Sequence, residues 1–399
     1  MRILKVTETY FPFLEKGGPP VKVRALARGL ARRGHQVTVL TADFGIARRA
    51  APAPTRSEFG WKIDEDGVEA IYLPSPLRYR AVTWNPRARA FCRSRLSEFD
   101  AVHIFGLYDF LGPTVSAACR RRGIPYVLEP MGMFRPIVRN VWLKQLFHSW
   151  PGGAMVRGAH RFIATAKQEA DELKAGGVPE EKIVLRRNGV EPPGKLPAAG
   201  TFRRQWGIPA EARLILFLGR LVKKKSPDLL VEAFARWRAT DAKGASAWLV
   251  FAGPEERDGT RADLNTLVRT RGLQGETVYT GALYGDAKWA AYGDADVFVL
   301  PSQNENFGNT AAEAVACGTP VIVTENCGIA PYLAGRAGLV VPHDAEALGG
   351  ALARVLGDPA LHSRFMAGCA EVTASLRWEE PVAEMEALYR TLAIEAGRG

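Results

Sequence analysis

A strand, a glycine-containing loop, a short helix and a second strand follow one another over residues 296–323, and this order limits the fold strongly. Asp296–Leu300 and Val321–Val323 are apolar runs of strand character. Between them, a polar loop with Gly308 leads into a helix predicted over Thr310–Ala316. Units of this kind build parallel sheets covered by helices.

Two carboxylates flank the turn in this unit. Glu305 lies in the loop and Glu313 lies on the helix. The helix N-terminus presents backbone N–H groups that favour an anion, whereas a carboxylate is a good acceptor for sugar hydroxyls. An anion site beside two hydroxyl acceptors suggests a nucleotide sugar as the ligand.

The same alternation of strands and helices runs through the whole chain, in two halves separated by the proline-rich connector Pro192–Gly200. We therefore expect two doubly wound α/β domains, 1–195 and 200–377, with a cleft between the carboxyl ends of their strands. The predicted strands are 2–7, 37–40, 68–73, 101–105, 125–129, 161–164, 183–186, 213–218, 247–252, 277–279, 296–300, 321–323 and 339–341. The predicted helices are 21–33, 86–98, 109–122, 141–156, 166–175, 227–237, 262–271, 286–292, 310–316, 345–356, 359–374 and 379–393.

The composition is that of a globular protein in a reducing compartment. The 399 residues suffice for two cores, and no apolar run approaches the roughly 18–20 residues of a membrane span. The N-terminus has no signal-peptide pattern, and the five cysteines show no C-x-x-C spacing. We expect a cytoplasmic protein.

The excess of positive over negative charge lies entirely in the first half of the chain. Residues 1–200 carry 32 Lys and Arg against 18 Asp and Glu, whereas residues 201–399 carry 21 against 24. Two interpretations remain open: arginines that merely solvate helix faces, or a positive face that meets an anionic substrate or an anionic membrane surface. We expect no nucleic-acid partner, because no nucleic-acid-binding motif accompanies the charge.

Gly17-Gly18 lies between the first predicted strand and the first predicted helix. A glycine pair at this place lets the backbone approach a ligand closely. The pattern is not G-x-G-x-x-G, so the dinucleotide-binding fingerprint is missing, and this counts against a dehydrogenase.

Five motifs together resemble glycosyltransferase family 4, whose members are retaining enzymes of the GT-B type with two Rossmann-like domains. The motifs lie in family order and at family distances, and the resemblance covers nearly the whole chain. They are Gly17-Gly18 with Leu30 to Val39, Asn188-Gly-Val-Glu191, Gly219-Arg220 with Lys225, Glu305-x7-Glu313 with Phe307-Gly308, and Ala316 to Val321. The resemblance implies that the C-terminal helix, from about 378 to 399, crosses back to the N-terminal domain.

The resemblance also assigns roles to residues. Arg220 and Lys225 match the basic pair that grips the donor diphosphate, Glu305 matches the contact to the transferred sugar, and Glu313 matches the contact to the ribose hydroxyls. We therefore expect Glu305, Arg220 and Lys225 to be catalytic. The other residues expected to bind the donor are Gly17, Gly18, Gly253, Asn306, Phe307, Gly308 and Glu313, and the base is placed near 253–255 and 281–284.

One departure from the family pattern concerns general acid–base catalysis. Family members usually carry His-Gly after the strand at 125–129, and Met131 takes that position here. A methionine cannot transfer protons, so we assign no side-chain base and expect the departing phosphate oxygen to deprotonate the acceptor. Met131 and His103 are the acceptor-side candidates, and His103 either lines the acceptor site or is hydrogen-bonded at its strand end.

Asp294-Ala-Asp296 has the D-x-D spacing of the metal site in the other large glycosyltransferase fold. Here the motif opens a predicted buried strand, so we interpret it as structural. The histidines show no ligand spacing either. We expect neither a metal ion nor another cofactor.

The expected function is therefore retaining, metal-independent transfer of a hexose from a UDP- or GDP-linked sugar. The acceptor is expected to be a polysaccharide or a lipid-linked saccharide, bound by the N-terminal domain, with the donor in the C-terminal domain. The basic helix near residues 85–96 is the candidate contact to an anionic membrane face. The alternatives are an epimerase or phosphorylase on the same fold, and a catalytically inactive protein that binds polyanions or membranes.

Overall fold

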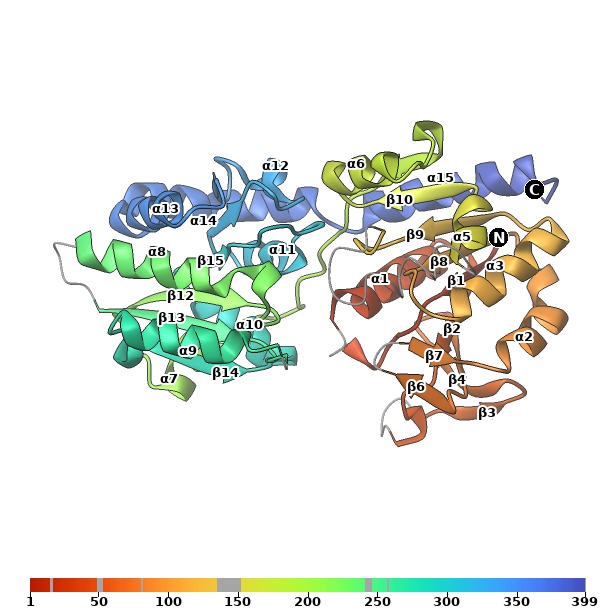
Figure 1. Cartoon of the computed structure of the whole chain (residues 1–399), viewed down its shortest axis with the longest axis horizontal. Helices are drawn as coiled ribbons and strands as arrows, with labels where there is room; N and C mark the ends of the chain where they lie inside the picture. Colours follow the sequence, from red (N-terminus) through yellow and green to blue (C-terminus); the bar gives the residue numbers. More distant parts are fainter. Residues whose placement is uncertain are drawn as a thin grey trace. The chain divides into compact units, whose positions relative to one another are not determined.

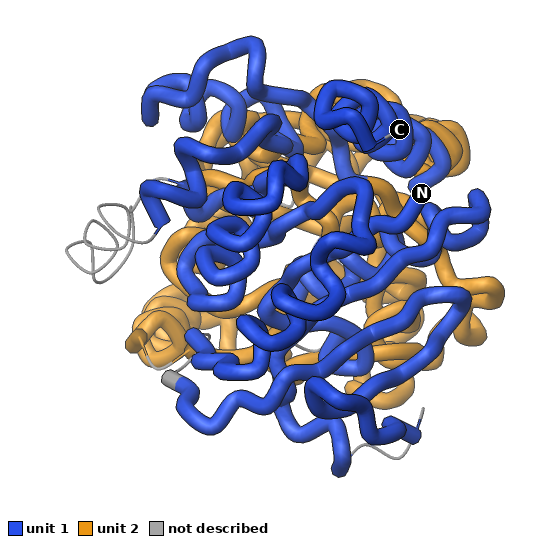
Figure 2. Tube along the Cα trace, turned by 90° about the vertical axis from the view of Figure 1, so that its right-hand side faces the viewer, with its two compact units in different colours: residues 1–188, 378–399 blue, residues 189–377 orange. Residues whose placement is uncertain are grey.

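The computed structural model describes residues 1–14, 17–48, 53–79, 82–134, 152–240, 246–256 and 258–398. The chain forms two compact units: residues 1–188 together with 378–399, and residues 189–377 (Figure 2). Unit 2 begins ahead of the proline-rich connector because the backbone N–H of Val190 donates to the carbonyl of Leu376 at 2.7 Å.

Unit 1 is built on a sheet with the strand order β11-β10-β9-β8-β1-β2-β5-β4-β3 (Figure 1). The seven strands from β11 to β5 are parallel, and β4 and β3 extend the sheet as antiparallel strands. The parallel strands are β1 (Arg2–Val6), β2 (Gln36–Ala42), β5 (Val68–Leu73), β8 (Ala101–Phe105), β9 (Tyr126–Glu129), β10 (Arg161–Ala164) and β11 (Ile183–Leu185). All seven are predicted from the sequence.

Three features of unit 1 differ from the prediction or escape it. Four strands are not predicted from the sequence: β3 (Thr55–Ser57), β4 (Gly60–Glu65), and β6 (Leu77–Tyr79) and β7 (Val82–Trp84), which form a separate hairpin. Helix α1 (Gly18–Arg32) begins three residues early, because proline fits the first turn of a helix. Most of the helix predicted over 141–156 lies outside the described residues. Its final part corresponds to α5 (Gly152–Arg157).

Helices cover both faces of the unit 1 sheet. One hydrophobic cluster joins the sheet to α2 (Ala88–Arg95), α3 (Leu111–Arg122), α5 and α6 (Lys167–Ala175), and a second cluster joins it to α1 and α15 (Glu379–Glu395). The C-terminal helix α15 therefore belongs to the N-terminal unit, as the sequence predicts (Figures 1 and 2). Its Val382 packs so closely on α1 that a Cβ atom at Gly29 would lie 2.5 Å from a Val382 methyl carbon.

Unit 2 has a wholly parallel sheet with the order β14-β13-β12-β15-β16-β17. Its strands are β12 (Arg213–Leu218), β13 (Ala247–Ala252), β14 (Thr277–Gly281), β15 (Val297–Leu300), β16 (Val321–Thr324) and β17 (Gly338–Val341). The helices are α7 (Thr201–Trp206), α8 (Pro227–Thr240), α9 (Thr260–Thr270), α10 (Gly285–Asp294), α11 (Asn309–Ala316), α12 (Ala330–Leu333), α13 (Ala345–Gly357) and α14 (Pro359–Ser375). Of these, α7 and α12 are not predicted.

The two faces of this sheet have separate cores. One cluster packs the sheet against α10, α11 and α14, and the other packs it against α8, α9 and α13. Both units are thus doubly wound α/β structures, and their strands direct their carboxyl ends toward the loops that carry the predicted site residues. None of the described helices is both long and apolar enough to cross a membrane.

Candidate functional site

The loop that carries Glu305 is fixed by backbone pairing. The N–H of Glu305 donates to the carbonyl of Asn326 at 3.0 Å, and the carbonyl of Glu305 accepts from the N–H of Gly328 at 3.0 Å. The N–H of Gln303 donates to the carbonyl of Lys224 at 3.0 Å, which joins this loop to the loop after β12. The Glu305 side chain is therefore presented from a rigid position beyond the end of β15.

Lys225 and Glu305 form an ion pair, although 80 residues separate them in the sequence. Both side chains are only partly exposed, by 17% and 20%. The short 3-10 turn Lys223–Lys225 places the lysine, and the following Ser226 adopts a left-handed conformation with φ of 48° before α8 begins. The structure thus brings two of the three predicted catalytic residues together.

Gly308 begins α11 with φ of 103°, a conformation that glycine adopts without strain. A Cβ atom there would lie 2.9 Å from a methyl carbon of Ile329, so a side chain would push the loop away. The side chain of Phe307 is buried in the unit 2 core, and its carbonyl accepts from the N–H of Ile329. Phe307 can therefore contribute backbone groups, but not its ring, to a ligand site next to Asn306.

Glu313 lies on α11 and is held by two partners from α10. Lys288 Nζ lies 2.8 Å from one carboxylate oxygen, and the hydroxyl of Tyr292 donates to the other at 2.9 Å. Burial is the largest cause that raises the pKa of Tyr292 well above its ordinary value, and the Glu313 charge adds to it. Tyr292 therefore stays protonated as a donor, and Glu313 is kept as an acceptor group.

Arg220 lies on the loop after β12, where this loop meets the loop after β13. The N–H of Leu221 donates to the carbonyl of Pro254 at 3.0 Å. Gly253 has φ of 150°, and a Cβ atom there would lie 1.8 Å from the carbonyl oxygen of Gly219, so only glycine permits this approach. The side chain of Arg220 is 64% exposed and pairs with Glu256 at 2.6 Å.

The predicted site residues of unit 1 lie at the carboxyl ends of its strands. Gly17, with φ of 106°, precedes α1, which begins at Gly18. Met131 follows β9 in a left-handed conformation with φ of 55°, which is uncommon for a residue with a side chain. The adjacent N–H of Gly132 donates to Glu169 at 2.6 Å, and this bond holds the turn.

His103 is fully buried in a polar network rather than exposed to a ligand. Its Nδ1 lies 2.6 Å from the hydroxyl of Tyr389, its Nε2 lies 3.4 Å from Glu129, and its ring stacks on Phe105. Burial lowers the pKa of His103 to about 3, and the nearby charge of Lys5 contributes. Of the two roles considered for His103, the structure shows hydrogen bonding, but in the middle of β8 rather than at its end.

Glu129 is the carboxylate at the centre of this buried network. It pairs with Lys22 at 2.6 Å and with Arg186 at 3.1 Å, and the carboxylate and guanidinium are both fully buried. Burial alone would raise the pKa of Glu129, but the charges of Arg186 and Lys22 outweigh it and hold the pKa well below its ordinary value. Lys5 completes the network through a 3.2 Å bond to the Tyr389 hydroxyl. Sequence reasoning missed this network.

Asp294 and Asp296 have structural partners. Asp294 accepts hydrogen bonds from the backbone N–H groups of Gly200, Phe202 and Arg203, at the start of α7. Asp296 pairs with the guanidinium of Arg203 at 2.8 Å and accepts from the N–H of Leu214 at 2.7 Å. Both lie at the amino end of β15, opposite to the end that carries Glu305. Among the described residues, no group of three or more His, Cys, Asp or Glu could hold a metal ion.

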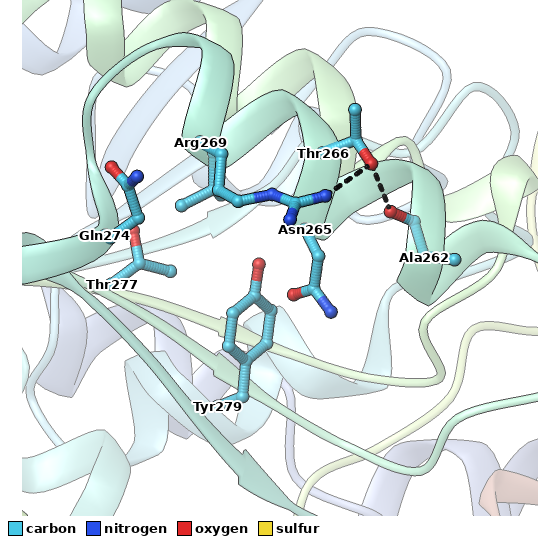
Figure 3. A pocket seen from close by; sticks show the side chains of 8 residues that line it. Ala262, Asn265, Thr266, Arg269, Gln274, Thr277 and Tyr279 are labelled. Carbon is cyan, nitrogen blue, oxygen red and sulfur yellow. Dashed lines mark hydrogen bonds between the residues drawn. The ribbon is translucent and has the colours of Figure 1, made fainter.

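A pocket of about 470 Å³ runs along α9 and β14 and contains none of the predicted site residues (Figure 3). The hydroxyl of Tyr279 points into it, between Arg269 and Asn265. The Tyr279 ring stacks on Phe251, with 5.4 Å between the ring centroids, and the guanidinium carbon of Arg261 lies 3.2 Å from the centroid of the Tyr279 ring. These contacts reduce the surface that the ring can offer to a ligand. The other lining residues are Ala262, Thr266, Val268, Gln274 and Thr277.

Comparison with known proteins places the two units in known families. Residues 17–189 match the family described as glycosyl transferase 4-like domain, and residues 199–368 match the family described as glycosyl transferases group 1. A D-inositol 3-phosphate glycosyltransferase 1 from Catenulispora acidiphila is 32% identical over 411 residues, covering 96% of this chain and 93% of that protein. A D-inositol 3-phosphate glycosyltransferase from Acidothermus cellulolyticus is 28% identical over 401 residues, covering 96% and 87%.

Solved structures share the fold. The sucrose-phosphate synthase from Thermosynechococcus elongatus superposes with a TM-score of 0.72 at 23% identity, covering 98% of both chains. The HepE protein of Anabaena, in complex with UDP and glucose, gives a TM-score of 0.76 at 14% identity, covering 98% of this chain and 100% of that chain. The chain is a glycosyltransferase of the GT-B fold and belongs to glycosyltransferase family 4.

Proposed function

We propose that the protein transfers a hexose, with retention, from a UDP- or GDP-linked sugar to a hydroxyl group of a polysaccharide or a lipid-linked saccharide. Unit 2 binds the donor and unit 1 binds the acceptor. The Lys225–Glu305 ion pair carries this proposal, because it joins a cation for the diphosphate to an acceptor for sugar hydroxyls beyond the carboxyl ends of the strands. The Anabaena protein HepE, described in complexes with UDP-glucose and with UDP and glucose, supports a nucleotide sugar as donor.

In the proposed reaction, the bond between the sugar C1 and the β-phosphate oxygen breaks, and the acceptor oxygen forms the new bond to C1. The acceptor proton passes to the departing phosphate oxygen, so the step needs no side-chain base. Arg220 and Lys225 stabilise the negative charge that the nucleoside diphosphate gains, and we propose that these two cations replace a metal ion. When the donor binds, Glu305 leaves Lys225 and accepts hydrogen bonds from the sugar.

Donor hydrolysis and thermal melting test the proposal without knowledge of the acceptor. Incubation with UDP- and GDP-sugars should yield slow release of the free sugar, and the matching nucleoside diphosphate should raise the melting temperature. Arg220→Ala should weaken nucleoside diphosphate binding by roughly 10- to 100-fold, because a hydrogen bond to a charged group is lost.

Lys223→Ala is the matched control, because Lys223 lies three residues away, is exposed and pairs only weakly with Asp263 at 3.8 Å. Its binding should match that of the wild type. An epimerised nucleotide sugar, or a sugar phosphate formed with inorganic phosphate, would favour the epimerase or phosphorylase alternative. Absence of both hydrolysis and stabilisation would contradict the proposed function and favour the inactive binding protein.

We also propose that the enzyme is cytoplasmic and that α2 brings it to an anionic membrane face. Arg89 and Arg93 are exposed on this helix and Arg87 is exposed directly before it, whereas Arg95 pairs with Glu69 at 2.9 Å. Vesicles with anionic lipid should retain the protein at low ionic strength and release it in high salt, because exposed charges are screened. Arg89→Glu with Arg93→Glu should abolish retention, and unchanged retention would rule out this helix as the contact.

A further inference from the structure

A second pocket, of about 510 Å³, lies on unit 1 between the β6–β7 hairpin and the start of α3. Its size is in the range of ordinary ligand pockets. Nine large hydrophobic side chains are exposed among the described residues, and three of them line this pocket: Leu77, Trp84 and Phe110, exposed by 65%, 49% and 47%. Their clustering distinguishes them from scattered surface apolar residues, which need no explanation.

The pocket lies on the side of unit 1 where ligands of α/β folds bind. The hairpin follows the carboxyl end of β5, and Phe110 follows the carboxyl end of β8 by a short loop. Gly17 and Met131 follow the carboxyl ends of β1 and β9 in the same sheet. The pocket is therefore at the strand ends that we propose for acceptor binding.

The base of the hairpin is held by strand pairing and by side-chain hydrogen bonds. Leu77 is paired with Trp84 in the β6–β7 register. At its base, the Thr83 hydroxyl donates to Asn85 at 2.9 Å, and the Asn85 amide donates to Ser75 at 2.8 Å. The base of the hairpin is thus held in place before any ligand arrives, which reduces the entropy cost of binding.

The lining fits an apolar chain next to an anion. Leu77, Val82, Trp84 and Phe110 supply apolar surface, and the polar side chains of the lining are those of Arg78 and Thr83. Since the Thr83 hydroxyl already donates to Asn85, it has no proton left for a sugar. Arg78 is exposed, with its guanidinium 5.3 Å from the ring centre of Phe44, and can meet an anionic group at the rim.

We propose that this pocket holds the apolar chain of a lipid-linked acceptor whose phosphate lies beside Arg78. The inference rests on the proposed function and specifies the acceptor class that the site takes. The pocket volume suits a single chain, and the guanidinium matches a phosphate in charge and geometry. A saccharide without an apolar chain would find few hydrogen-bonding partners here.

Calorimetry with n-alkyl phosphates of six, eight and ten carbons, below their micelle concentrations, tests the proposal. Affinity should rise by about fourfold for each added methylene until the pocket is full, because each buried methylene contributes to binding. Inorganic phosphate should bind at least tenfold more weakly than the ten-carbon phosphate. Arg78→Gln should weaken binding of the alkyl phosphates and leave binding of n-alkyl glucosides of equal chain length unchanged.

The double variant Leu77→Ser with Trp84→Ser should lose the dependence on chain length. Ile394→Ser is the matched control, because Ile394 is also an exposed apolar residue of unit 1, by 69%, but lies on α15. Equal loss in the control, or no dependence on chain length in the wild type, would overturn the proposal. All the replaced side chains are exposed, and thermal melting verifies that each variant is folded.

Other occupants of the pocket give different results. Retention on neutral phosphatidylcholine vesicles that the double variant abolishes, without binding of alkyl phosphates, would assign the pocket to a bilayer. A dimer that the same variant dissociates would assign it to a second copy of the chain. Hydrolysis of the nucleotide sugar by the wild type needs no acceptor, so its absence contradicts the proposed function while chain-dependent binding still supports the pocket.

Discussion

Replacing Glu305 with alanine should abolish sugar transfer while leaving nucleoside diphosphate binding largely intact. Lys225 and Arg220 remain to hold the diphosphate, whereas the acceptor for the hydroxyls of the transferred sugar is lost. We expect turnover to fall by about 10²- to 10³-fold or more, the usual loss when one preorganised polar group is removed from an active site. Steady-state donor hydrolysis and calorimetric titration with the nucleoside diphosphate measure the two effects separately.

Glu305→Gln tests whether the charge itself is required. It keeps the size of the side chain and one carbonyl acceptor, but it removes the ion pair to Lys225.

Glu371→Ala is a control for Glu305→Ala in the same unit, because Glu371 is 76% exposed and pairs with Arg336 on the surface at 2.6 Å. Activity of Glu305→Ala close to that of the wild type would refute the role of Glu305. A large loss of thermal stability in Glu305→Ala would assign the residue a structural role instead.

The donor half of the site could be predicted from the sequence because its residues lie in short motifs with fixed spacing. Arg220 with Lys225 and Glu305 with Glu313 each follow one strand and lie within a single loop–helix segment. The ion pair between Lys225 and Glu305 could not be predicted, because it depends on how two loops meet beyond the sheet. Likewise, Lys288 and Glu313 come from different helices, and their spacing in the sequence does not predict their contact.

The strands of the two sheets were predictable because parallel strands buried on both faces form continuous apolar runs. Strands β3, β4, β6 and β7 are short or polar, and their pairing depends on turns that the sequence signals weakly. The buried network of unit 1 could not be predicted from the sequence for a different reason. Its members are far apart in the sequence, by up to 384 residues, and charged residues are rarely buried. Lys5 lies on β1, Glu129 on β9 and Tyr389 on α15, and Arg186 directly follows β11.

The Glu129→Gln variant should be about 3–5 kcal/mol less stable than the wild type in unit 1 at pH 7. Removing the carboxylate leaves the charges of Lys22 and Arg186 buried without a counter-ion. Breaking a buried ion pair in this way is strongly destabilising. Arg186 depends strongly on Glu129, because its Nε and Nη1 atoms have no hydrogen-bond partner among the described residues. Urea unfolding, followed by circular dichroism and tryptophan fluorescence, measures the loss.

Glu395→Gln is the control for Glu129→Gln, since it removes an exposed ion pair of the same unit, to Arg161 at 3.6 Å. Its effect should stay below about 1 kcal/mol. Equal stability of Glu129→Gln and the wild type would mean that Lys22 and Arg186 reach water or find other partners in solution. The prediction would then be wrong.

The buried amine of Lys5, in the same network, makes the stability of the protein depend on pH. Burial, and next the charge of Arg186, lower the pKa of Lys5 from 10.5 to about 7, while Glu129 acts in the opposite direction. Between these two values the unfolded chain binds a proton that the folded chain releases, so this group makes stability rise as the pH increases from about 7 to about 10.5. The full effect is on the order of 5 kcal/mol. Below pH 7 the destabilisation caused by the buried Lys5 amine stays constant.

Lys5→Met should therefore remove this rise while raising stability at pH 7, because an apolar side chain of similar length replaces a buried amine. The Tyr389 hydroxyl keeps its partner His103 at 2.6 Å in this variant, so no buried donor is stranded. Urea unfolding at pH 7, 8 and 9 should give a steeper increase in stability for the wild type than for Lys5→Met. Parallel curves for the two proteins would show that Lys5 keeps an ordinary pKa in the folded state. Because Glu129 raises the pKa of Lys5, Glu129→Gln should lower the pKa of Lys5 further. Together, Glu129→Gln and Lys5→Met therefore test whether the two residues belong to one coupled network.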